Sequence, residues 1–164
     1  MDDVKPMQWA SAKANLQFIC VTAYSGYRSS AADSAAAQHV LPPDADHEAL
    51  GAAVLDALDH SRFLTLDEID VFFDYRLVAQ RYHAWVRSLM ERFGYKTKKA
   101  MFTGMNSCAI ERRDGRIVIS PSNHEKLEAW SGGGIAPEDH VSIPADSLPA
   151  AVGAALRLAL SRCI

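Results

Sequence analysis

Residues 16–24 read LQFICVTAY, a run of aliphatic, β-branched and aromatic side chains that predicts a β-strand. Apolar residues occupy both alternating sets of positions. Both faces of this strand therefore need cover, and we expect it near the centre of a sheet. The segment that follows, as far as Asp46, is rich in Ser, Ala, Gly, Pro and Asp, which predicts a long loop.

The first helical signal comes directly after this loop. Asp46 can cap a helix that runs to about residue 61. Leu50, Val54 and Leu58 recur at four-residue spacing and mark its apolar face.

A long helix is predicted next, preceded by a short segment that fits either a helix or a strand. Thr65 and Glu68 have the spacing of a capping box, which favours a short helix, although residues 69–73 also fit a strand. The clearest helical periodicity covers residues 74–93 and stops at Gly94. The apolar stripe of this helix, which we expect to face the core, consists of Val78, Tyr82, Trp85, Leu89 and Phe93.

Residues 99–120 have the pattern of a β-hairpin. The Asp-Gly pair at residues 114–115 is a strong two-residue turn signal. Closing the hairpin there places Ile110 opposite Ile119, with Cys108 on the same face. We therefore interpret Cys108 as a small core residue.

One more strand and one more helix complete the pattern. Val141 and Ile143 mark the strand, which Pro144 ends. Asp146 or Ser147 can cap the helix that follows. The predicted order is thus β-α-α-β-β-β-α in a single domain over residues 1–164. Strands without regular βαβ alternation favour an α+β fold, with an antiparallel sheet of four to five strands packed with three to four helices.

Composition excludes several classes of protein. The 164 residues are 49% hydrophobic, which is enough for a packed core, and no apolar run is long enough to span a membrane. The start of the chain is acidic, unlike a secretory signal, and the cysteines are odd in number and far apart. We expect a cytoplasmic protein without a disulfide framework.

Charge is distributed unevenly along the chain. Residues 44–74 contain nine acidic residues and one arginine, a net charge of −8 in a chain whose total is −3. Residues 76–126 contain eleven basic and four acidic residues, a net charge of +7. An acidic surface can accelerate association with a basic partner. The alternative interpretation is that both stretches are solvated helix faces that offset one another.

Catalytic and metal-binding patterns are missing from the sequence. Neither His47 nor His124 belongs to a complete zinc-protease motif, and no CxxC pair occurs. A thiol mechanism would need a base within reach of Cys108, and the spacing to His124 does not establish one. We predict no catalytic residues, no metal and no cofactor.

Four stretches of the sequence resemble the immunity proteins of contact-dependent growth inhibition systems, the CdiI family found in Burkholderia and other proteobacteria. The resemblance extends from Asn15 to Cys163 and involves the whole fold. The stretches are NLQFICVTAYSGYRSS, VFFDYRLVAQRYHAWVRSLMERFGYKTKKAMF, MNSCAIERRDGRIVISPSNHEKLEAW and VSIPADSLPAAVGAALRLALSRC.

The resemblance implies an inhibitor that binds a cognate toxin domain, the C-terminal domain of a CdiA protein, as a 1:1 heterodimer. Several toxins of such systems are nucleases, including tRNases. The acidic stretch, found independently of the family, suits a basic nuclease cleft. The predicted toxin-binding residues are Asp56, Asp59, Asp67, Glu68, Asp70 and Asp74.

Two other functions remain open at this point. One is a small hydrolase of unrecognised type. The other is an RNA-binding module with a basic patch, although the overall acidity of the chain is atypical of nucleic-acid binders. Its candidate residues are Lys96, Lys98, Lys99, Arg112, Arg113 and Arg116.

Overall fold

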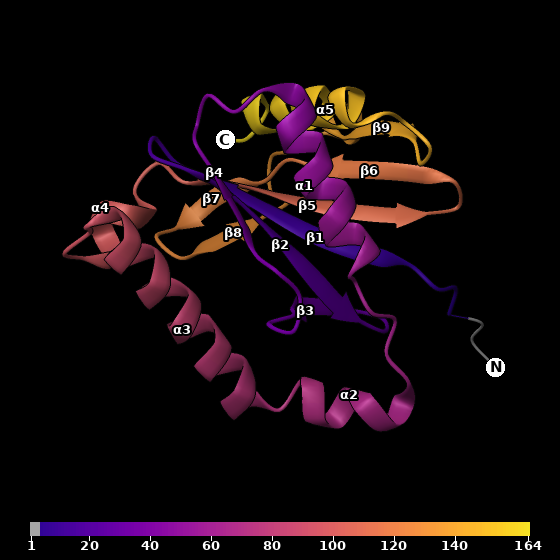
Figure 1. The fold of residues 1–164 in the computed structure, drawn as a ribbon, viewed down its shortest axis with the longest axis horizontal. Coiled ribbons are helices and arrows are strands. Elements are labelled where there is room, and N and C mark those ends of the chain that lie inside the picture. Colours follow the sequence, from indigo (N-terminus) through magenta and orange to yellow (C-terminus); the bar gives the residue numbers. More distant parts are fainter. Residues whose placement is uncertain (1–3) are drawn as a thin grey trace.

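A seven-stranded antiparallel sheet runs through the computed structural model, which describes residues 4–164 (Figure 1). Six strands follow the order β3-β2-β1-β5-β6-β9, and β4 pairs with the other end of β2. The strands of this sheet are β1 (Gln8–Ala14), β2 (Ile19–Gly26), β3 (Ser30–Ala32), β4 (His39–Leu41), β5 (Asn106–Arg113), β6 (Arg116–Ser120) and β9 (Val141–Pro144). The separate two-stranded sheet consists of β7 (Asn123–Lys126) and β8 (Ala129–Ser131).

Five α-helices are described in the same part of the chain. They are α1 (His47–Asp59), α2 (Leu66–Phe72), α3 (Tyr75–Phe93), α4 (Lys98–Phe102) and α5 (Pro149–Ser161), and a 3₁₀ turn covers Pro137–Asp139. None of these helices combines the length and hydropathy that a membrane span requires.

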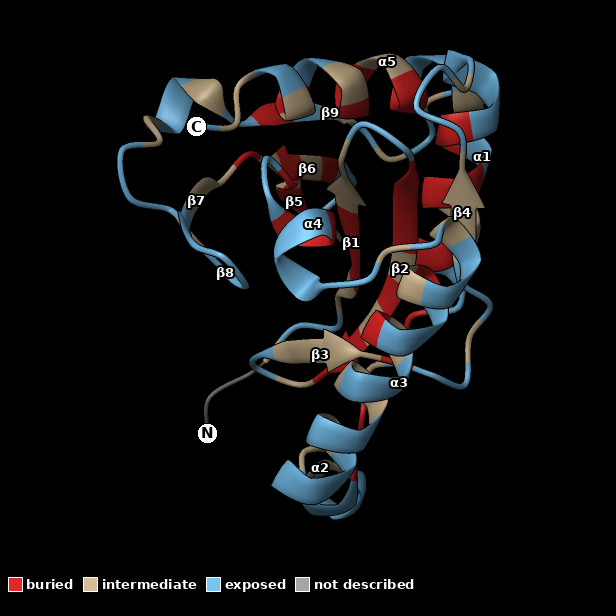
Figure 2. Ribbon diagram, turned by 90° about the vertical axis from the view of Figure 1, so that its left-hand side faces the viewer, coloured by how far each residue is buried: buried red, intermediate tan, exposed pale blue. Residues whose placement is uncertain are grey.

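Helices α1 and α5 cover one face of the sheet and build the main core (Figures 1 and 2). Strand side chains alternate between faces, so each strand gives one set to this core. Central β1 contributes Ala10 and Ala12, while β5 and β6 contribute Ile110 and Ile119. The small alanines of β1 leave room for the two helices above the middle of the sheet.

The two helices meet at a pair of glycines. A Cβ atom on Gly51 of α1 would lie 1.6 Å from the carbonyl oxygen of Pro149. A Cβ atom on Gly153 of α5 would lie 1.8 Å from the carbonyl oxygen of His47. Any side chain at either position would collide with backbone, so only glycine permits this approach.

A second, smaller core lies on the opposite face, where α3 and α4 cover one end of the sheet. Phe18 and Phe102 are fully buried there, together with Val86 and Leu89 of α3. Figure 2 shows that α3 is buried only along its inner side and that α2 lies at the periphery. The predicted stripe of α3 is therefore only half-buried, except at Leu89.

The α+β class, the antiparallel sheet and several local predictions are confirmed. Asp46 caps α1, the Thr65–Glu68 capping box begins α2, and Gly94 ends α3 with a φ of 72°. Asp114 and Gly115 form the hairpin turn with φ of 51° and 73°, and Ile110 pairs with Ile119 as predicted.

The sheet has more strands than the four to five that the sequence predicted. Strand β1 has the sequence QWASAKA, whose alanines and serine have low strand propensity, and its pairing with β2 and β5 fixes its conformation. Strands β3 and β4 lie within the segment predicted as a loop, and both pair with the edge of β2.

Two predicted boundaries are wrong. The hairpin does not begin at Lys99, because Thr97 caps the short helix α4 and β5 starts only at Asn106. The last helix is capped by neither Asp146 nor Ser147. Pro149, whose fixed φ suits the first helical position, sets the start, so the cap position falls on Leu148.

The glycine contact between α1 and α5 predicts an unusual response to Gly153→Ala. In an exposed helix this change stabilises by about 1 kcal/mol. Here the new methyl group would push the helices apart, and we expect a loss of about 1–3 kcal/mol or more in the free energy of unfolding. Urea unfolding measures this loss. A Gly132→Ala control, where a Cβ meets nothing within 4 Å, should change little. An unchanged or raised stability of Gly153→Ala would contradict the proposed contact.

Candidate functional site

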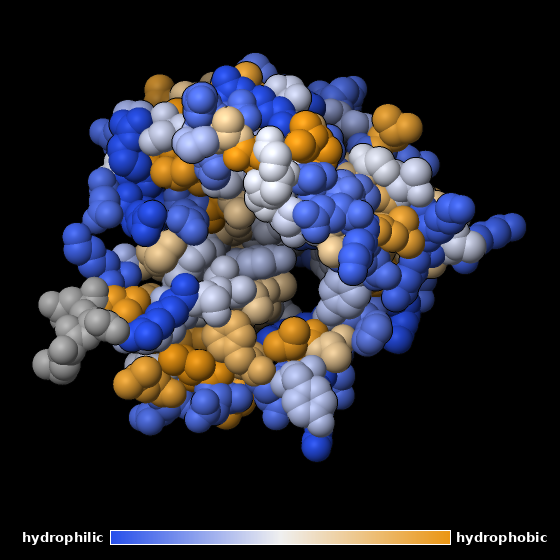
Figure 3. Space-filling view, turned by 180° about the vertical axis from the view of Figure 1, so that it is seen from behind, coloured by the Kyte–Doolittle hydropathy of each residue, from blue (hydrophilic) through white to orange (hydrophobic). Residues whose placement is uncertain are grey.

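The second face of the sheet is left partly open beside α3, and this opening is the candidate site. Two adjoining cavities of about 270 and 510 Å³ occupy it, and both are bordered by Ser11, Lys13, Tyr24 and Ser30. We call them together the sheet–α3 cleft. The space-filling view shows the surface hollowed beside the sheet (Figure 3). The combined space can accept several side chains of a partner.

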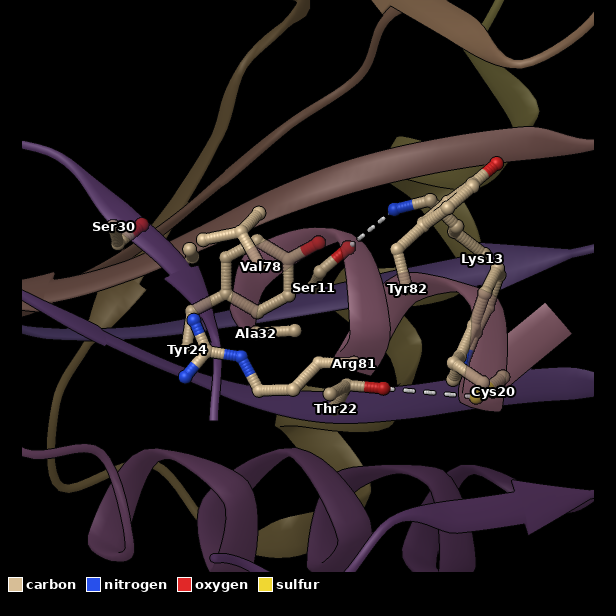
Figure 4. Close-up of a pocket in the computed structure, with 12 residues that line it drawn as sticks. Ser11, Lys13, Cys20, Thr22, Tyr24, Ser30, Ala32, Val78, Arg81 and Tyr82 are labelled. Carbon is tan, nitrogen blue, oxygen red and sulfur yellow. Dashed lines mark hydrogen bonds between the residues drawn. The ribbon is translucent and has the colours of Figure 1, made fainter. Parts of the chain in front are cut away.

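Strand alternation decides which side chains line this cleft. The residues of β1 and β2 that face away from the main core include Ser11, Lys13, Thr22 and Tyr24 (Figure 4). Helix α3 supplies the opposite wall with Val78, Arg81, Tyr82 and Trp85. Tyr82 and Trp85 of the α3 stripe therefore line this cavity while also packing against the edge of the second core.

Lys13 lies between aromatic rings at the floor of the cleft. Its Nζ is 5.3 Å from the ring centre of Trp130, 5.9 Å from that of Tyr24 and 6.0 Å from that of Trp85. The same ammonium donates a hydrogen bond of 3.1 Å to the Ser11 hydroxyl. Attraction to ring faces stabilises the cation without neutralising its charge.

Arg81 adds a second positive charge to the cleft. Its guanidinium donates a 2.6 Å hydrogen bond to the carbonyl of Phe72 and lies 4.4 Å from the centre of the Phe72 ring. Among the described residues that border the smaller cavity, none is acidic. This cavity therefore has a positive electrostatic character that suits a carboxylate or a carbonyl oxygen.

An ion pair between the buried Asp33 carboxylate and the half-exposed Arg62 side chain holds the β3 side of the cleft. The Asp33 side chain is 3% exposed and accepts hydrogen bonds from Arg62 Nε at 2.7 Å and from the Ser25 hydroxyl at 2.6 Å. Burial alone would raise the pKa of the Asp33 carboxyl. The bonds from Arg62, Ser25 and the Ala35 amide together lower it below its usual value. The pair ties the end of β3 to the loop before α2.

The far end of the cleft is fixed by contacts with the β7–β8 hairpin. Tyr82 donates a hydrogen bond to Glu128, which also lies 3.4 Å from Lys98. Burial, together with the neighbouring Glu128 carboxylate, raises the pKa of Tyr82, which stays protonated at neutral pH. Trp130 donates to the Met105 carbonyl at 2.9 Å and stacks on His124. The aromatic floor is thus held in place by hydrogen bonds.

Comparison with known proteins identifies the family. The family model described as "CdiI: CDI immunity protein" matches residues 8–163, which is nearly the whole chain. The chain belongs to the CdiI family of immunity proteins.

A curated relative and two solved structures are similar to the chain over nearly its whole length. The immunity protein CdiI-YPIII of Yersinia pseudotuberculosis is 46% identical, with 99% of each chain covered. A chain of a CdiA-CT/CdiI toxin and immunity complex from Yersinia pseudotuberculosis is 43% identical, with a TM-score of 0.91 over 99% of this chain and 100% of that one. A Neisseria meningitidis protein of unknown function, NMB0488, is 40% identical, with a TM-score of 0.91 over 100% of this chain and 99% of that one.

The predicted acidic residues of this CdiI-family chain lie at the end of α1, along α2 and, in the case of Asp74, at the start of α3, outside the cleft. Four of them have local roles. Asp56 lies 2.6 Å from His39 and Asp59 lies 2.7 Å from Arg112, while Glu68 and Asp74 cap helices. The remaining two, Asp67 and Asp70, are exposed on α2, as Glu68 is as well.

Sequence analysis missed the cleft because its residues are far apart in the chain. Lys13, Arg81 and Trp130 come from three separate segments, and none of them belongs to a recognisable motif. A weak signal does exist in β1, where Ser11 and Lys13 alternate with alanines. That pattern indicates a strand with one polar face, but only the surrounding elements show that the face is enclosed.

The residues of the other two candidate sites, the Cys108–His124 pair and the basic patch, do not come together in the structure. Cys108 has the thiol of Cys163 as its neighbour, whereas the His124 ring contacts Trp130 and the Leu127 carbonyl. The basic candidates fall into two groups, one around α4 and one at the β5–β6 turn, at opposite sides of the molecule (Figure 1). The described residues contain no cluster of potential metal ligands.

The Asp33–Arg62 pair predicts a stability change that depends on pH. A carboxyl whose folded-state pKa is lowered stabilises the fold above its unfolded pKa of about 4 and loses this contribution at lower pH. We expect Asp33→Asn to cost about 1–3 kcal/mol at pH 7. The difference from wild type should shrink towards pH 3.

Urea unfolding at both pH values measures this difference. Asp44→Asn, which removes an exposed carboxylate from the loop before α1, is the matched control and should have little effect at either pH. A cost of Asp33→Asn that stays constant between the two pH values would contradict a contribution from the charged pair.

Proposed function

We propose that this chain is the cytoplasmic immunity protein of a contact-dependent growth inhibition system and that it neutralises its cognate toxin domain in a 1:1 complex. The observation that carries the proposal is the whole-chain similarity to a protein found in a toxin and immunity complex. The family consists of immunity proteins. We propose that this chain inhibits its toxin by binding it and catalyses no reaction of its own.

The surface that we assign to the toxin is the sheet–α3 cleft. It is concave, its walls are held by hydrogen bonds, and tryptophan, tyrosine and arginine side chains line it. These residue types carry much of the binding energy at protein interfaces. A toxin segment that places a carboxylate or carbonyl oxygen between Lys13 and Arg81 would form charge-assisted hydrogen bonds there.

The acidic residues of α1 and α2 are proposed as a second, electrostatic part of the interface. Asp56, Asp59, Asp67, Glu68, Asp70 and Asp74 form this acidic surface. Phe72 of α2 contacts Arg81, which lines the cleft, so a toxin in the cleft would approach this surface. Nuclease toxins must hold a polyanion and are commonly basic, so we propose a nuclease, such as a tRNase, as the partner.

Protection of growing cells tests the proposed function directly. Co-expression of this chain with the toxin domain encoded beside it should restore growth, because the complex sequesters the toxin. A toxin domain from an unrelated system should still arrest growth. Failure to protect against the adjacent toxin while both proteins are folded and abundant would contradict the proposal.

Removal of the cleft cation should weaken binding without unfolding the protein. Lys13→Met keeps the aliphatic stem between the rings and deletes the charge. A lost charge-assisted contact of about 2 kcal/mol corresponds to a rise in Kd of roughly 30-fold. Isothermal titration with the purified toxin domain measures the change. Lys99→Met, at an exposed position of α4, is the matched control. Equal effects of the two variants on Kd would argue against the cleft as the toxin site.

The acidic surface is expected to control the rate of association. Asp67→Asn with Asp70→Asn removes two exposed charges of α2 that are free of helix-capping roles. Stopped-flow association with the toxin should become slower and less dependent on salt. Glu138→Gln with Asp146→Asn removes two exposed charges near α5 and should leave the rate nearly unchanged. Identical kinetics for the two double variants would contradict electrostatic attraction by α2.

A further inference from the structure

Two cysteines that are 55 positions apart in sequence meet below the end of α5. The Sγ atom of Cys108, in the middle of β5, lies 3.7 Å from the Sγ atom of Cys163, which follows α5. A disulfide requires about 2.0 Å between the sulfurs, so closing this gap takes a movement of under about 2 Å. Both thiols are free in this structure.

The surrounding backbone holds Cys163 at this place. The next residue, Ile164, donates from its amide to the Ser122 carbonyl at 3.0 Å and accepts from the His124 amide at 2.7 Å. These bonds attach the segment after α5 to the start of β7. The Cys163 thiol also lies 3.5 Å from the Ser107 carbonyl, one residue before Cys108. The approach of the sulfurs is therefore fixed by the fold on both sides.

The two thiols differ in exposure and acidity. Cys108 is fully buried in the main core, whereas Cys163 is partly accessible to solvent. The hydrogen bond between the sulfurs, added to burial, raises the pKa of Cys108. The same bond lowers the pKa of Cys163 below its usual value. Cys163 is thus the thiol that an oxidant can reach and that is more readily deprotonated.

We propose that Cys163 and Cys108 form a reversible redox pair, in which a hydroperoxide oxidises Cys163 and Cys108 then closes a disulfide. The Cys163 thiolate attacks one peroxide oxygen. The O–O bond breaks, a sulfenic acid remains on Cys163, and the other oxygen leaves as water or alcohol. The Cys108 sulfur then attacks the Cys163 sulfur, the S–O bond breaks, and the hydroxyl leaves as water with the Cys108 proton. The two thiols lose two electrons, which reduce the hydroperoxide.

The bond would attach the end of α5 to the central part of the sheet. Closing a loop of this length in the unfolded chain favours the folded state, so the oxidised protein should melt several degrees higher. The Cys108 side chain belongs to the main core beneath α5, on the face of β5 opposite the cleft, although the neighbouring Ser107 and Ser122 border the larger cavity. The inference therefore does not depend on the proposed toxin site.

Hydrogen peroxide treatment of the purified full chain tests the pair. Alkylation under denaturing conditions, followed by intact mass measurement, counts the thiols that remain. We expect the count to fall from three to one, with a raised melting temperature, and both changes should be reversed by dithiothreitol. Peptide mapping should find the Cys108 peptide joined to the Cys163 peptide.

Two variants separate this pair from general oxidation. Cys20→Ser leaves the pair intact and should still form the bond, whereas Cys163→Ser, at a partly exposed position that tolerates a polar group, should form none. A bond that includes Cys20, a bond between two molecules, or a Cys163 sulfinic acid beside a reduced Cys108 would overturn the proposal.

Discussion

The alternation of side chains along β1 is the constraint on which the rest of this structure depends. Ala10 and Ala12 face the main core, and their small size lets α1 and α5 lie close over the centre of the sheet. Ser11 and Lys13 necessarily face the other way. Because α3 covers only one end of that second face, the polar residues of the central strand are left at the floor of a cleft.

The charged side chains of the cleft are held in position by contacts within the fold. Lys13 is held between aromatic rings, Arg81 is fixed by a carbonyl of α2, and the β3 side is anchored by the bond from Arg62 to the buried Asp33 carboxylate. A partner that binds preordered side chains loses less conformational entropy than one that must order them. Neither cation has an acidic neighbour among the residues bordering the smaller cavity, so a carboxylate from a partner would complete the site.

The sequence predicted the features that depend on local interactions. The Asp-Gly turn at residues 114–115, the capping box before α2 and the end of α3 at Gly94 follow from the preferences of single residues, and all three are confirmed. The acidic stretch was also visible, since its residues are close together in the chain, and its role in binding stays a prediction.

Features that depend on distant residues were not predicted. Strand β1 consists of residues with weak strand preference and exists because two strong strands flank it. The cleft is assembled from β1, β2 and α3, so no window of sequence contains it. The Cys108–Cys163 contact likewise joins β5 to the end of α5. The cysteines are odd in number and far apart in the sequence, and this spacing did not predict the contact.

Hydrogen–deuterium exchange of this chain, alone and with its cognate toxin domain, tests most directly the claim that the toxin occupies the cleft. Central amides of β1 and β2 are already bonded to neighbouring strands. The informative segments are therefore β3, which borders the cleft, and the α2–α3 corner, which contacts Arg81 of the cleft wall. The account predicts that these segments exchange more slowly in the complex, while α5 is unchanged. Slower exchange in α5 with no change at β3 and the α2–α3 corner would contradict it.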